Sequence, residues 1–137
     1  MRFQKTTEYA IRVMVFLADH VNERYSVNQL HLNLQIPYKY LGRLMNKLSL
    51  TGLVDVRQGK HGGYQVIRDL AKIYLSDIVN AVEGLEDYSR CVLGFPECSG
   101  DNPCSLHALW LERQESIKNM IYNTTLADLQ KNGSVKY

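Results

Sequence analysis

The stretch that decides the fold is SVNQLHLNLQIPYKYLGRLMNKLSLTGLVDVRQGKHGGYQVI, residues 26–67. Ser26 is followed three residues later by Gln29, a capping box that predicts a short helix from residue 27 to about residue 34. Pro37 suits the first turn of the next helix, because proline has no amide hydrogen to leave unpaired there. The apolar side of that helix comprises Leu41, Leu44, Met45 and Leu48.

The end of this stretch predicts a β-hairpin. Thr51-Gly52 is expected to end the preceding helix. Two short β-rich runs then flank a loop that contains three glycines and the basic side chains Arg57, Lys60 and His61. The sequence therefore predicts a hairpin with a long, basic tip.

Upstream of residue 26, apolar residues again recur at helical spacing. They are Ala10, Val13, Met14, Leu17 and Val21. Thr6 or Thr7 is the expected cap, and the helix is expected to end near His20. Helix, short helix, tight turn, helix and basic-tipped hairpin form the layout of a winged helix-turn-helix, which we expect over residues 1–70.

The charges are divided unevenly along the chain. Residues 1–68 carry ten Lys and Arg against four acids, whereas residues 69–137 carry six against ten. The basic half suits a phosphate backbone, so we expect double-stranded operator DNA as a partner.

On the third helix, Arg43 and Asn46 suit base edges, with Arg43 the preferred candidate, while Lys and Tyr more often bind phosphate. The candidate DNA-binding residues are Tyr38, Lys39, Gly42, Arg43, Asn46, Lys47, Arg57, Lys60, His61, Gly62 and Gly63. Each of them could instead be an ordinary solvated residue.

The acidic half, residues 69–137, is expected to support assembly, and residues 71–137 are expected to form the cysteine loop and a dimerisation helix in one compact chain with the winged helix. A short helix is predicted from Ser76 to near Gly84, and a longer one from Pro103 to about Tyr122. The apolar side of the longer helix comprises Leu106, Leu109, Trp110, Ile117, Met120 and Ile121. A small domain has little room to bury all of these side chains, so a two-fold homodimer interface is expected, with packing on the chain's own core as the alternative.

The three cysteines all lie in RCVLGFPECSGDNPCSLHALW, residues 90–110. The first predicted helix carries Arg12 and is too short to span a bilayer, so we expect a cytoplasmic protein with no membrane association. In a reducing compartment, clustered thiols point to metal binding or redox chemistry, and thiolates are the usual ligands of iron–sulfur clusters. With Asn102 as cap and Pro103 in the first turn, Cys104 is expected at a helix N-terminus, where the dipole favours its thiolate.

These features together resemble the IscR/NsrR-type regulators, bacterial winged-helix dimers that sense an iron–sulfur cluster. The motifs that carry the resemblance are TTEYAIRVMVFLA, GLVDVRQGKHGGYQV, CSLHALW and NTTLADL. The resemblance implies that Cys91, Cys98 and Cys104 ligate the cluster. A fourth ligand at His107 corresponds to the IscR type, with a 2Fe-2S cluster, and we favour it. Glu8 from the other subunit corresponds to the NsrR type, with a 4Fe-4S cluster.

Two departures from the family pattern are visible. The gap between Cys91 and Cys98 differs by about one residue from both patterns, which leaves the cluster type open. Gly42 stands where IscR-type proteins place a glutamate that helps read a base. Because glycine costs about 1 kcal/mol of helix stability relative to alanine, it could let the backbone approach DNA closely, or it could be a tolerated defect.

Other functions are weaker matches to the sequence. The same fold could act without a cluster, through thiol switching, a small molecule or a protein partner. Three Cys and one His could also hold zinc, although the gaps fit common zinc spacings poorly. An enzyme is not expected, because the sequence has no phosphate loop, no nucleophile with its base and no paired carboxylates in a recognisable setting.

Overall fold

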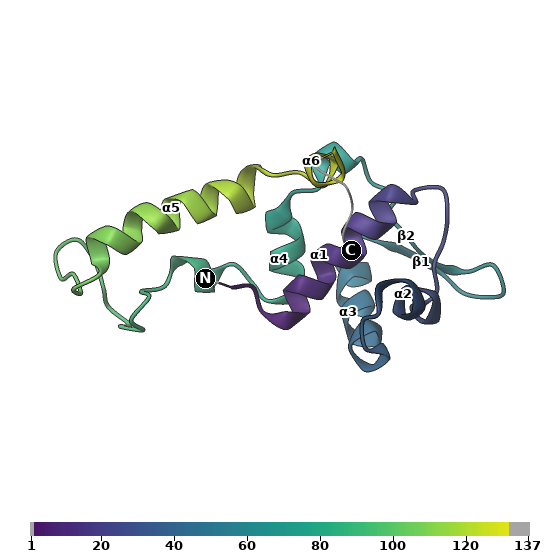
Figure 1. Ribbon diagram of the computed structural model, residues 1–137, viewed down its shortest axis with the longest axis horizontal. Helices are drawn as coiled ribbons and strands as arrows, with labels where there is room; N and C mark the ends of the chain where they lie inside the picture. Colours follow the sequence, from purple (N-terminus) through teal and green to yellow (C-terminus); the bar gives the residue numbers. More distant parts are fainter. Residues whose placement is uncertain (1, 132–137) are drawn as a thin grey trace.

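The computed structural model describes residues 2–131, which form helices and one two-stranded antiparallel hairpin. The elements are α1 Lys5–Asp19, α2 Val27–Leu34, α3 Tyr38–Leu50, β1 Asp55–Arg57, β2 Gly63–Gln65, the 3₁₀ turn η1 Leu70–Lys72, α4 Leu75–Val82, the 3₁₀ turn η2 Glu86–Ser89, α5 His107–Asn123 and α6 Leu126–Lys131. Figure 1 shows α5 extending away from the other helices, with the hairpin at the opposite end of the molecule. The predicted fold, mainly helical with one small hairpin, is confirmed.

The helix-turn-helix forms as its sequence predicts. The capping box is present, with the amide of Gln29 donating to Ser26 Oγ at 3.1 Å and the amide of Ser26 donating to Gln29 Oε1 at 2.8 Å. The turn places Gln35 in the left-handed region (φ +56°). Pro37 is the residue just before the first turn of α3 rather than a member of it. Gly52 follows α3 with φ +78°, as the predicted helix end requires.

The hairpin pairs Asp55 with Gln65 and Arg57 with Gly63. Tyr25 extends this small sheet, because its amide and carbonyl exchange hydrogen bonds with Tyr64 at 3.0 and 2.8 Å. Gly63 has φ +131°, and a Cβ there would lie 2.7–3.0 Å from the backbone of Tyr25 and Ser26. Glycine is therefore needed at this position for the hairpin to dock on the rest of the fold.

Helix α1 crosses the centre of the fold and packs on α2, α3, α4 and α6. Its fully buried residues include Val13, Met14 and Leu17. The rest of the core comes from other residues of α1, from residues 30–82 and from Leu126. The prediction of a Thr6 or Thr7 cap is wrong, because the helix begins earlier, after Gln4, and Thr7 is buried within its first turn. Val21 lies beyond the helix and is 38% exposed.

The main core contains no residue from 83–125 among those the structure describes. The cysteine loop, residues 90–106, is therefore built outside the core of the winged helix. A second, smaller cluster of Leu75, Val79, Tyr88 and Ile121 joins α4, η2 and α5. This cluster attaches the long helix to the rest of the chain.

Two predicted helix starts in the second half are wrong. Helix α4 begins at Leu75, where the Asp77 carboxylate accepts the Tyr74 amide at 2.8 Å, so Ser76 is inside the helix. Helix α5 begins at His107 and not at Pro103. Asn102 consequently caps no helix, and Cys104 lies in the loop, three residues before α5.

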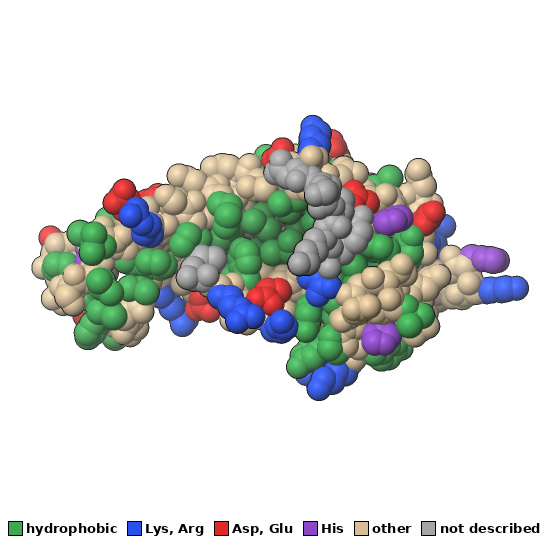
Figure 2. Space-filling view, in the orientation of Figure 1, with side chains coloured by type: hydrophobic (Ala, Val, Ile, Leu, Met, Phe, Trp, Pro, Cys, Tyr) green, Lys and Arg blue, Asp and Glu red, His purple; other side chains and the backbone are tan. Residues whose placement is uncertain are grey.

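The predicted apolar side of α5 divides into two sets. Ile121 is buried, and Trp110 and Ile117 are half-buried toward η2 and α4. Leu106, Leu109 and Met120 are 40%, 67% and 45% exposed. Figure 2 shows hydrophobic side chains gathered over α4 and α5 and again around the cysteine loop. Packing on the chain's own core thus accounts for only part of the apolar surface.

Within residues 2–131, none of the helices has the length and apolar character needed to cross a membrane.

Candidate DNA interface and metal centre

The outer side of α3 presents most of the predicted DNA-binding residues to solvent. Tyr38 is 56% exposed, and Lys39, Gly42, Arg43 and Asn46 are also exposed. A Cβ at Gly42 would meet nothing within 4 Å, so nothing in the described structure requires glycine there. Packing within the chain therefore does not explain the glycine at this position.

Lys47 lies differently from the other candidates on α3. Its Nζ donates to the carbonyl oxygen of Val82 at 3.4 Å. That carbonyl is the last of α4, where a cation is favoured by the helix dipole. Lys47 therefore connects α3 to α4, a contact that its position on the polar side of the helix did not reveal.

The hairpin tip carries the other set of predicted DNA contacts. Lys60 and His61 are exposed, and Figure 2 shows a cationic side chain and a histidine at the far tip of this projection. A hollow of about 420 Å³ lies between the tip and the α1–α2 connection, lined by Asn22, Arg24, Gln29, Lys60, His61, Gly62 and Gln65. Its lining is polar and basic, which suits a phosphate.

Two arginines that the sequence did not single out hold the DNA-facing elements in place. Arg24 contacts Asp55 Oδ2 at 2.6 Å and donates to the Gly63 carbonyl at 3.1 Å, so it fixes both strands of the hairpin. Arg12 donates to the carbonyl of Leu34 at 2.6 Å and so fixes the end of α2. The sequence alone does not distinguish either arginine from an ordinary solvated arginine on the surface.

The three cysteines converge in one place. Their sulfur atoms all lie within 4.8 Å of one another. The Sγ atoms of Cys91 and Cys104 are 3.6 Å apart, and Sγ of Cys98 lies 3.3 Å from Nδ1 of His107. Beside them is a cavity of about 200 Å³, lined also by Ser89, Arg90, Trp110, Leu111 and Gln114. The structure thus brings all four predicted ligands of the IscR-type set to one site.

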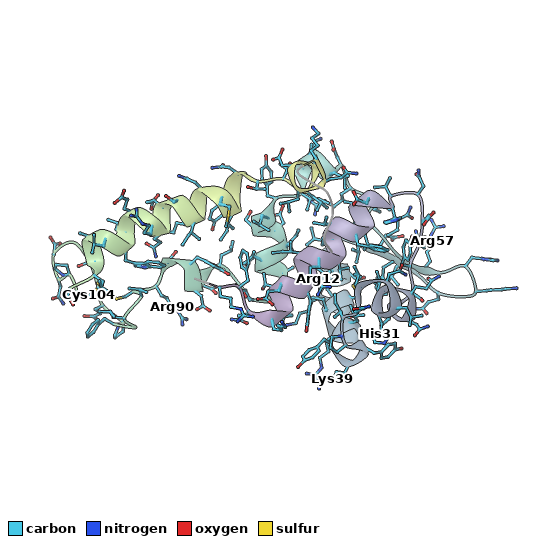
Figure 3. The ribbon with its side chains drawn as sticks, viewed as in Figure 1. Arg12, His31, Lys39, Arg57, Arg90 and Cys104 are labelled. Carbon is cyan, nitrogen blue, oxygen red and sulfur yellow. The ribbon has the colours of Figure 1, made fainter. Side chains whose placement is uncertain are left out.

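Helix α5 fixes the start of the cysteine loop. Trp110 Nε1 and Gln114 Nε2 both donate to the carbonyl oxygen of Arg90, at 3.1 and 3.5 Å. Arg90 directly precedes Cys91, so two side chains of the helix determine where the first thiol lies. Figure 3 shows Arg90 and Cys104 at this end of the molecule and Arg57 of the hairpin at the other.

The thiols differ in acidity. Partial burial raises the pKa of Cys91, but hydrogen bonds from the backbone amides of Phe95 and Leu93 and from the neighbouring thiols lower it by more. The pKa of Cys91 is therefore below its ordinary value. Burial raises the pKa of Cys104; the Leu106 amide opposes this, and the thiols of Cys91 and Cys98 add to the increase. The predicted thiolate-favouring position of Cys104 is therefore wrong, because no helix begins at that residue.

The donor set fits an iron–sulfur cluster in its chemistry. Three convergent thiols and an imidazole provide four soft or borderline ligands, and amide hydrogen bonds to a sulfur, as at Cys91, are typical of such sites. The loop that carries Cys98 contains no regular helix or strand, so it can adjust around an inorganic group.

Glu8, the alternative fourth ligand, lies on α1 and is paired within its own chain. Its carboxylate contacts Arg2 Nε at 3.0 Å and Lys5 Nζ at 3.2 Å, and these cations hold the pKa of the carboxyl below its ordinary value. A metal bound by Glu8 would have to displace at least one of these ion pairs.

Glu83 connects the two halves of the molecule. One carboxylate oxygen accepts from Thr7 Oγ1 at 2.6 Å and from the Gln4 amide at 3.2 Å, at the start of α1. The other accepts from the hydroxyl of Tyr88, two residues before Arg90. Burial and the hydrogen bond to Glu83 raise the pKa of Tyr88, so the phenol stays a donor at neutral pH. No sequence pattern distinguishes this glutamate from the other acids of residues 69–137, ten in all.

Comparison with known proteins supports the prediction made from the sequence motifs. A family model named Rrf2, described as an iron-dependent transcriptional regulator, matches residues 3–132. The transcriptional regulator IscR of Xenorhabdus nematophila is 32% identical over 136 residues, which cover 98% of this chain and 82% of the relative. IscR of Serratia proteamaculans is similar to the same extent. These relatives are transcriptional regulators, which confirms that the chain is a regulator and not an enzyme.

Solved structures show the same architecture. CymR, the global cysteine regulator of B. subtilis, superposes with a TM-score of 0.82 at 24% identity, over 98% of this chain and 99% of that one. IscR of T. potens superposes with a TM-score of 0.74 at 25% identity, over 96% and 88%. The fold is thus shared by a cysteine regulator and by an IscR protein.

Proposed function

The chain belongs to the Rrf2 family of transcriptional regulators, and we propose that it binds operator DNA as a homodimer, with an affinity set by an iron–sulfur cluster in the cysteine loop. The observation that carries the proposal is the convergence of three thiols and His107 at the end of a DNA-binding fold. Cysteines that served only as packing residues would have no reason to gather at one half-buried site outside the main core.

The DNA contacts of the proposal follow from the exposed residues. Arg43 and Asn46 on α3 would contact base edges in the major groove, and Lys39 and Tyr38 would contact phosphates. Lys60, His61 and Arg57 of the hairpin would reach the adjacent backbone or minor groove. Gly63 is buried against Tyr25 and Ser26, and a Cβ at Gly62 would clash with the backbone of Arg57, so the packing of the hairpin itself accounts for both glycines. Lys47 already donates to the Val82 carbonyl, and because an ammonium has three donors, its remaining hydrogens would be available to a phosphate.

The homodimer of the proposal uses the exposed side of α5. Leu109 and Met120 are eleven residues apart, which is three helical turns, so they lie on one side of the helix. A second copy packed along α5 would cover both. The two winged-helix heads, residues 1–70 of each chain, would then read two half-sites, as winged-helix dimers do.

The cluster would be held by Cys91, Cys98 and Cys104, with His107 as the favoured fourth ligand and Glu8 of a second copy as the alternative. Such a group supplies redox-sensitive ligation and a charge that changes on oxidation, nitrosylation or loss of iron. His107 is favoured because it already lies 3.3 Å from the sulfur of Cys98, whereas Glu8 is held by two cations. A 2Fe-2S cluster accordingly remains the favoured type and 4Fe-4S the alternative.

Contacts within the chain connect the cysteine loop to the winged-helix head and would transmit a change in the loop. Trp110 and Gln114 fix Arg90, and Tyr88 donates to Glu83, which holds the start of α1. Next to Glu83, Val82 accepts from Lys47 of the recognition helix. Two arrangements of the loop would bias the position of α4 against α1 and α3, which is what coupling between the two sites requires.

Zinc is the second candidate for this site, and the sulfur spacing is compatible with it. Thiolates around one tetrahedral zinc lie about 3.8 Å apart, given bonds of about 2.3 Å. The Cys91–Cys104 separation of 3.6 Å is close to that value without any movement. A zinc-bound chain would be a cluster-free regulator of the same fold, and elemental analysis separates the two.

The proposal is tested on full-length protein purified without oxygen. We expect broad visible absorption with about two iron and two sulfide per chain for a 2Fe-2S cluster, or about four of each for 4Fe-4S. Cys98→Ala should abolish the absorption, and Ser105→Ala, in the same loop, should leave it intact. Loss of the spectrum in His107→Ala but not in Glu8→Gln assigns the fourth ligand. Iron-free protein with one zinc per chain would overturn the cluster proposal.

A further inference from the structure

The cysteines of the loop are not equivalent in their contacts. Cys98 is engaged by two groups, because its Sγ lies 3.3 Å from Nδ1 of His107 and accepts the Cys104 amide at 3.4 Å. Cys91 and Cys104 face each other, with Sγ atoms 3.6 Å apart. All three side chains are half-buried and present as free thiols.

From this arrangement we propose that the metal-free protein forms a reversible disulfide between Cys91 and Cys104, with Cys98 left as a thiol. This bond would be a protected, oxidised form of the sensor that cannot accept a metal or a cluster. The inference rests on the geometry of the metal-free chain and not on which inorganic group the proposed function assigns to the site.

The geometry requires little movement. A disulfide brings its sulfur atoms to about 2.05 Å, so the two sulfurs must approach by about 1.5 Å. Both cysteines lie in segments without helix or strand, so a change of side-chain rotamer and a small backbone adjustment can supply that approach. The disulfide would close residues 91–104 into a loop, while the hydrogen bonds of Trp110 and Gln114 to Arg90 keep its base in place.

The reaction balances with a peroxide as oxidant. One thiolate attacks the peroxide: an S–O bond forms, the O–O bond breaks, and hydroxide leaves, giving a sulfenic acid. The second thiolate attacks that sulfur: the S–S bond forms, the S–O bond breaks, and the oxygen leaves as water after taking a proton. In total, two thiols are oxidised by two electrons and one hydrogen peroxide is reduced to two waters. Disulfides in reducing compartments are usually of this transient, redox-sensing kind.

A consequence follows for metal binding. The bond uses two of the three thiols, so only Cys98 and His107 remain of the four candidate ligands. Two ligands hold neither a cluster nor a structural zinc. The oxidised chain should therefore regain its capacity for metal only after a thiol reductant opens the bond.

The test uses full-length metal-free protein treated with hydrogen peroxide in small excess. Intact mass should fall by two hydrogen atoms, the chain should stay monomeric in size on a denaturing gel without reductant, and peptide mapping should find Cys91 linked to Cys104. Cys98→Ala should form the same bond, and Cys91→Ala and Cys104→Ala should not. A dominant bond that includes Cys98, a bond between two chains, or oxidation to sulfinic acid without a disulfide would overturn the inference.

Reconstitution with iron and sulfide then separates this inference from the proposed function. We expect the oxidised chain to take up no cluster and the same sample, once reduced, to take it up. If the disulfide forms but the reduced chain never assembles a cluster, the inference stands and the cluster proposal fails. If the reduced chain assembles a cluster but peroxide produces no Cys91–Cys104 bond, the inference fails and the cluster proposal stands.

Discussion

Among single residues, Gly42 is expected to lower the stability of the fold while favouring DNA binding. It lies in the middle of α3, where glycine weakens a helix, and its surroundings are open. Its absence of internal neighbours fits a position where the backbone itself approaches DNA. The glutamate that IscR-type proteins place here is missing, so the operator read by this chain is expected to differ.

Replacing Gly42 with Ala should therefore raise the free energy of unfolding by about 1 kcal/mol while weakening operator binding. The gain arises because alanine loses less backbone entropy, and the loss arises because the added methyl group would enter the DNA contact. Chemical denaturation and a DNA titration measure the two effects, with Asn119→Ala on α5 as a helix substitution away from the DNA face. Unchanged DNA binding in Gly42→Ala would identify the glycine as a tolerated defect.

Sequence reasoning located most single residues of the site but not their partners. Cys91, Cys98, Cys104 and His107 could be named because their chemistry is distinctive and their spacing local. Arg24, Glu83 and Gln114 could not, since each acts through a neighbour distant in the sequence, and a charged or amide side chain has no pattern of its own. Lys47 shows the same limit, because only the packing of α3 on α4 reveals its contact with Val82.

Among the helices and strands, the junction between α4 and η2 is where the proposed coupling would pass. Glu83 holds the start of α1 with one oxygen and Tyr88 with the other. A glutamine there has a single acceptor oxygen, so it can keep one of these contacts as an acceptor but not both. The junction is thus sensitive to a change that leaves the shape of the side chain almost intact.

Glu83→Gln should preserve the visible spectrum and reduce the difference in operator affinity between loaded and metal-free protein, which for coupled sites is typically about 5- to 150-fold. Glu86→Gln, a neighbouring exposed glutamate, should keep the full difference. DNA titrations of both forms of each variant provide the measurement. A full difference in Glu83→Gln would show that the signal does not pass through this carboxylate.

Helix α6 illustrates a contribution to the winged helix from the far end of the chain. Thr125 and Asp128 cap it reciprocally: the Thr125 amide donates to Asp128 Oδ2 at 2.9 Å, and the Asp128 amide donates to Thr125 Oγ1 at 3.1 Å. The buried side chain of Leu126, in the first turn, belongs to the main core. Stability of the head therefore depends on this short helix.

These hydrogen bonds from Thr125 lower the pKa of the Asp128 carboxyl below its ordinary value of 3.8. A depressed folded-state pKa means that the stabilisation is present above that ordinary value and is lost as the pH falls through the folded-state pKa. Asp128→Asn should lower the melting temperature at neutral pH, and the gap to the parent should close as the pH falls below 3.8. Thermal melts of both proteins across that pH range provide the measurement. A difference in melting temperature that does not depend on pH would contradict a stabilising role of the Asp128 carboxylate.

The element boundaries show where sequence patterns are reliable. The capping box at Ser26 and the glycine after α3 marked helix ends correctly because each is a local, stereochemical signal. The starts of α4 and α5 were placed wrongly. Ser76 and Asn102-Pro103 have the right residue types for a helix start, but α4 begins one residue earlier, at Leu75, and the Cys104 amide donates to Sγ of Cys98 in the loop before α5.

At the scale of the whole molecule, the cysteine loop and the hairpin lie at opposite ends (Figure 1). A signal from the loop must therefore cross the molecule through α4 and α1, or reach the head of a second copy. The exposed apolar side of α5 makes the second route available, since a dimer along α5 would bring together elements of two chains.

Leu109→Glu should raise the dissociation constant of the dimer about tenfold or more, because a charge would replace an apolar contact in the interface. Analytical ultracentrifugation over a concentration series measures it. Lys118→Glu also introduces a carboxylate, but Lys118 is nine residues from Leu109 and so lies on the opposite side of α5, and this variant should leave the dimer intact. Equal behaviour of both variants would place the interface elsewhere.

The central claim, that a cluster in the cysteine loop sets operator affinity, is tested most directly by a DNA titration. The probe is duplex DNA selected from a random pool by the cluster-loaded protein, and the parent chain and Cys98→Ala are titrated before and after treatment with nitric oxide or an iron chelator. The parent is predicted to change its affinity on treatment, whereas Cys98→Ala should bind with one fixed affinity. A parent that binds equally tightly in every state, and no differently from Cys98→Ala, would contradict the claim.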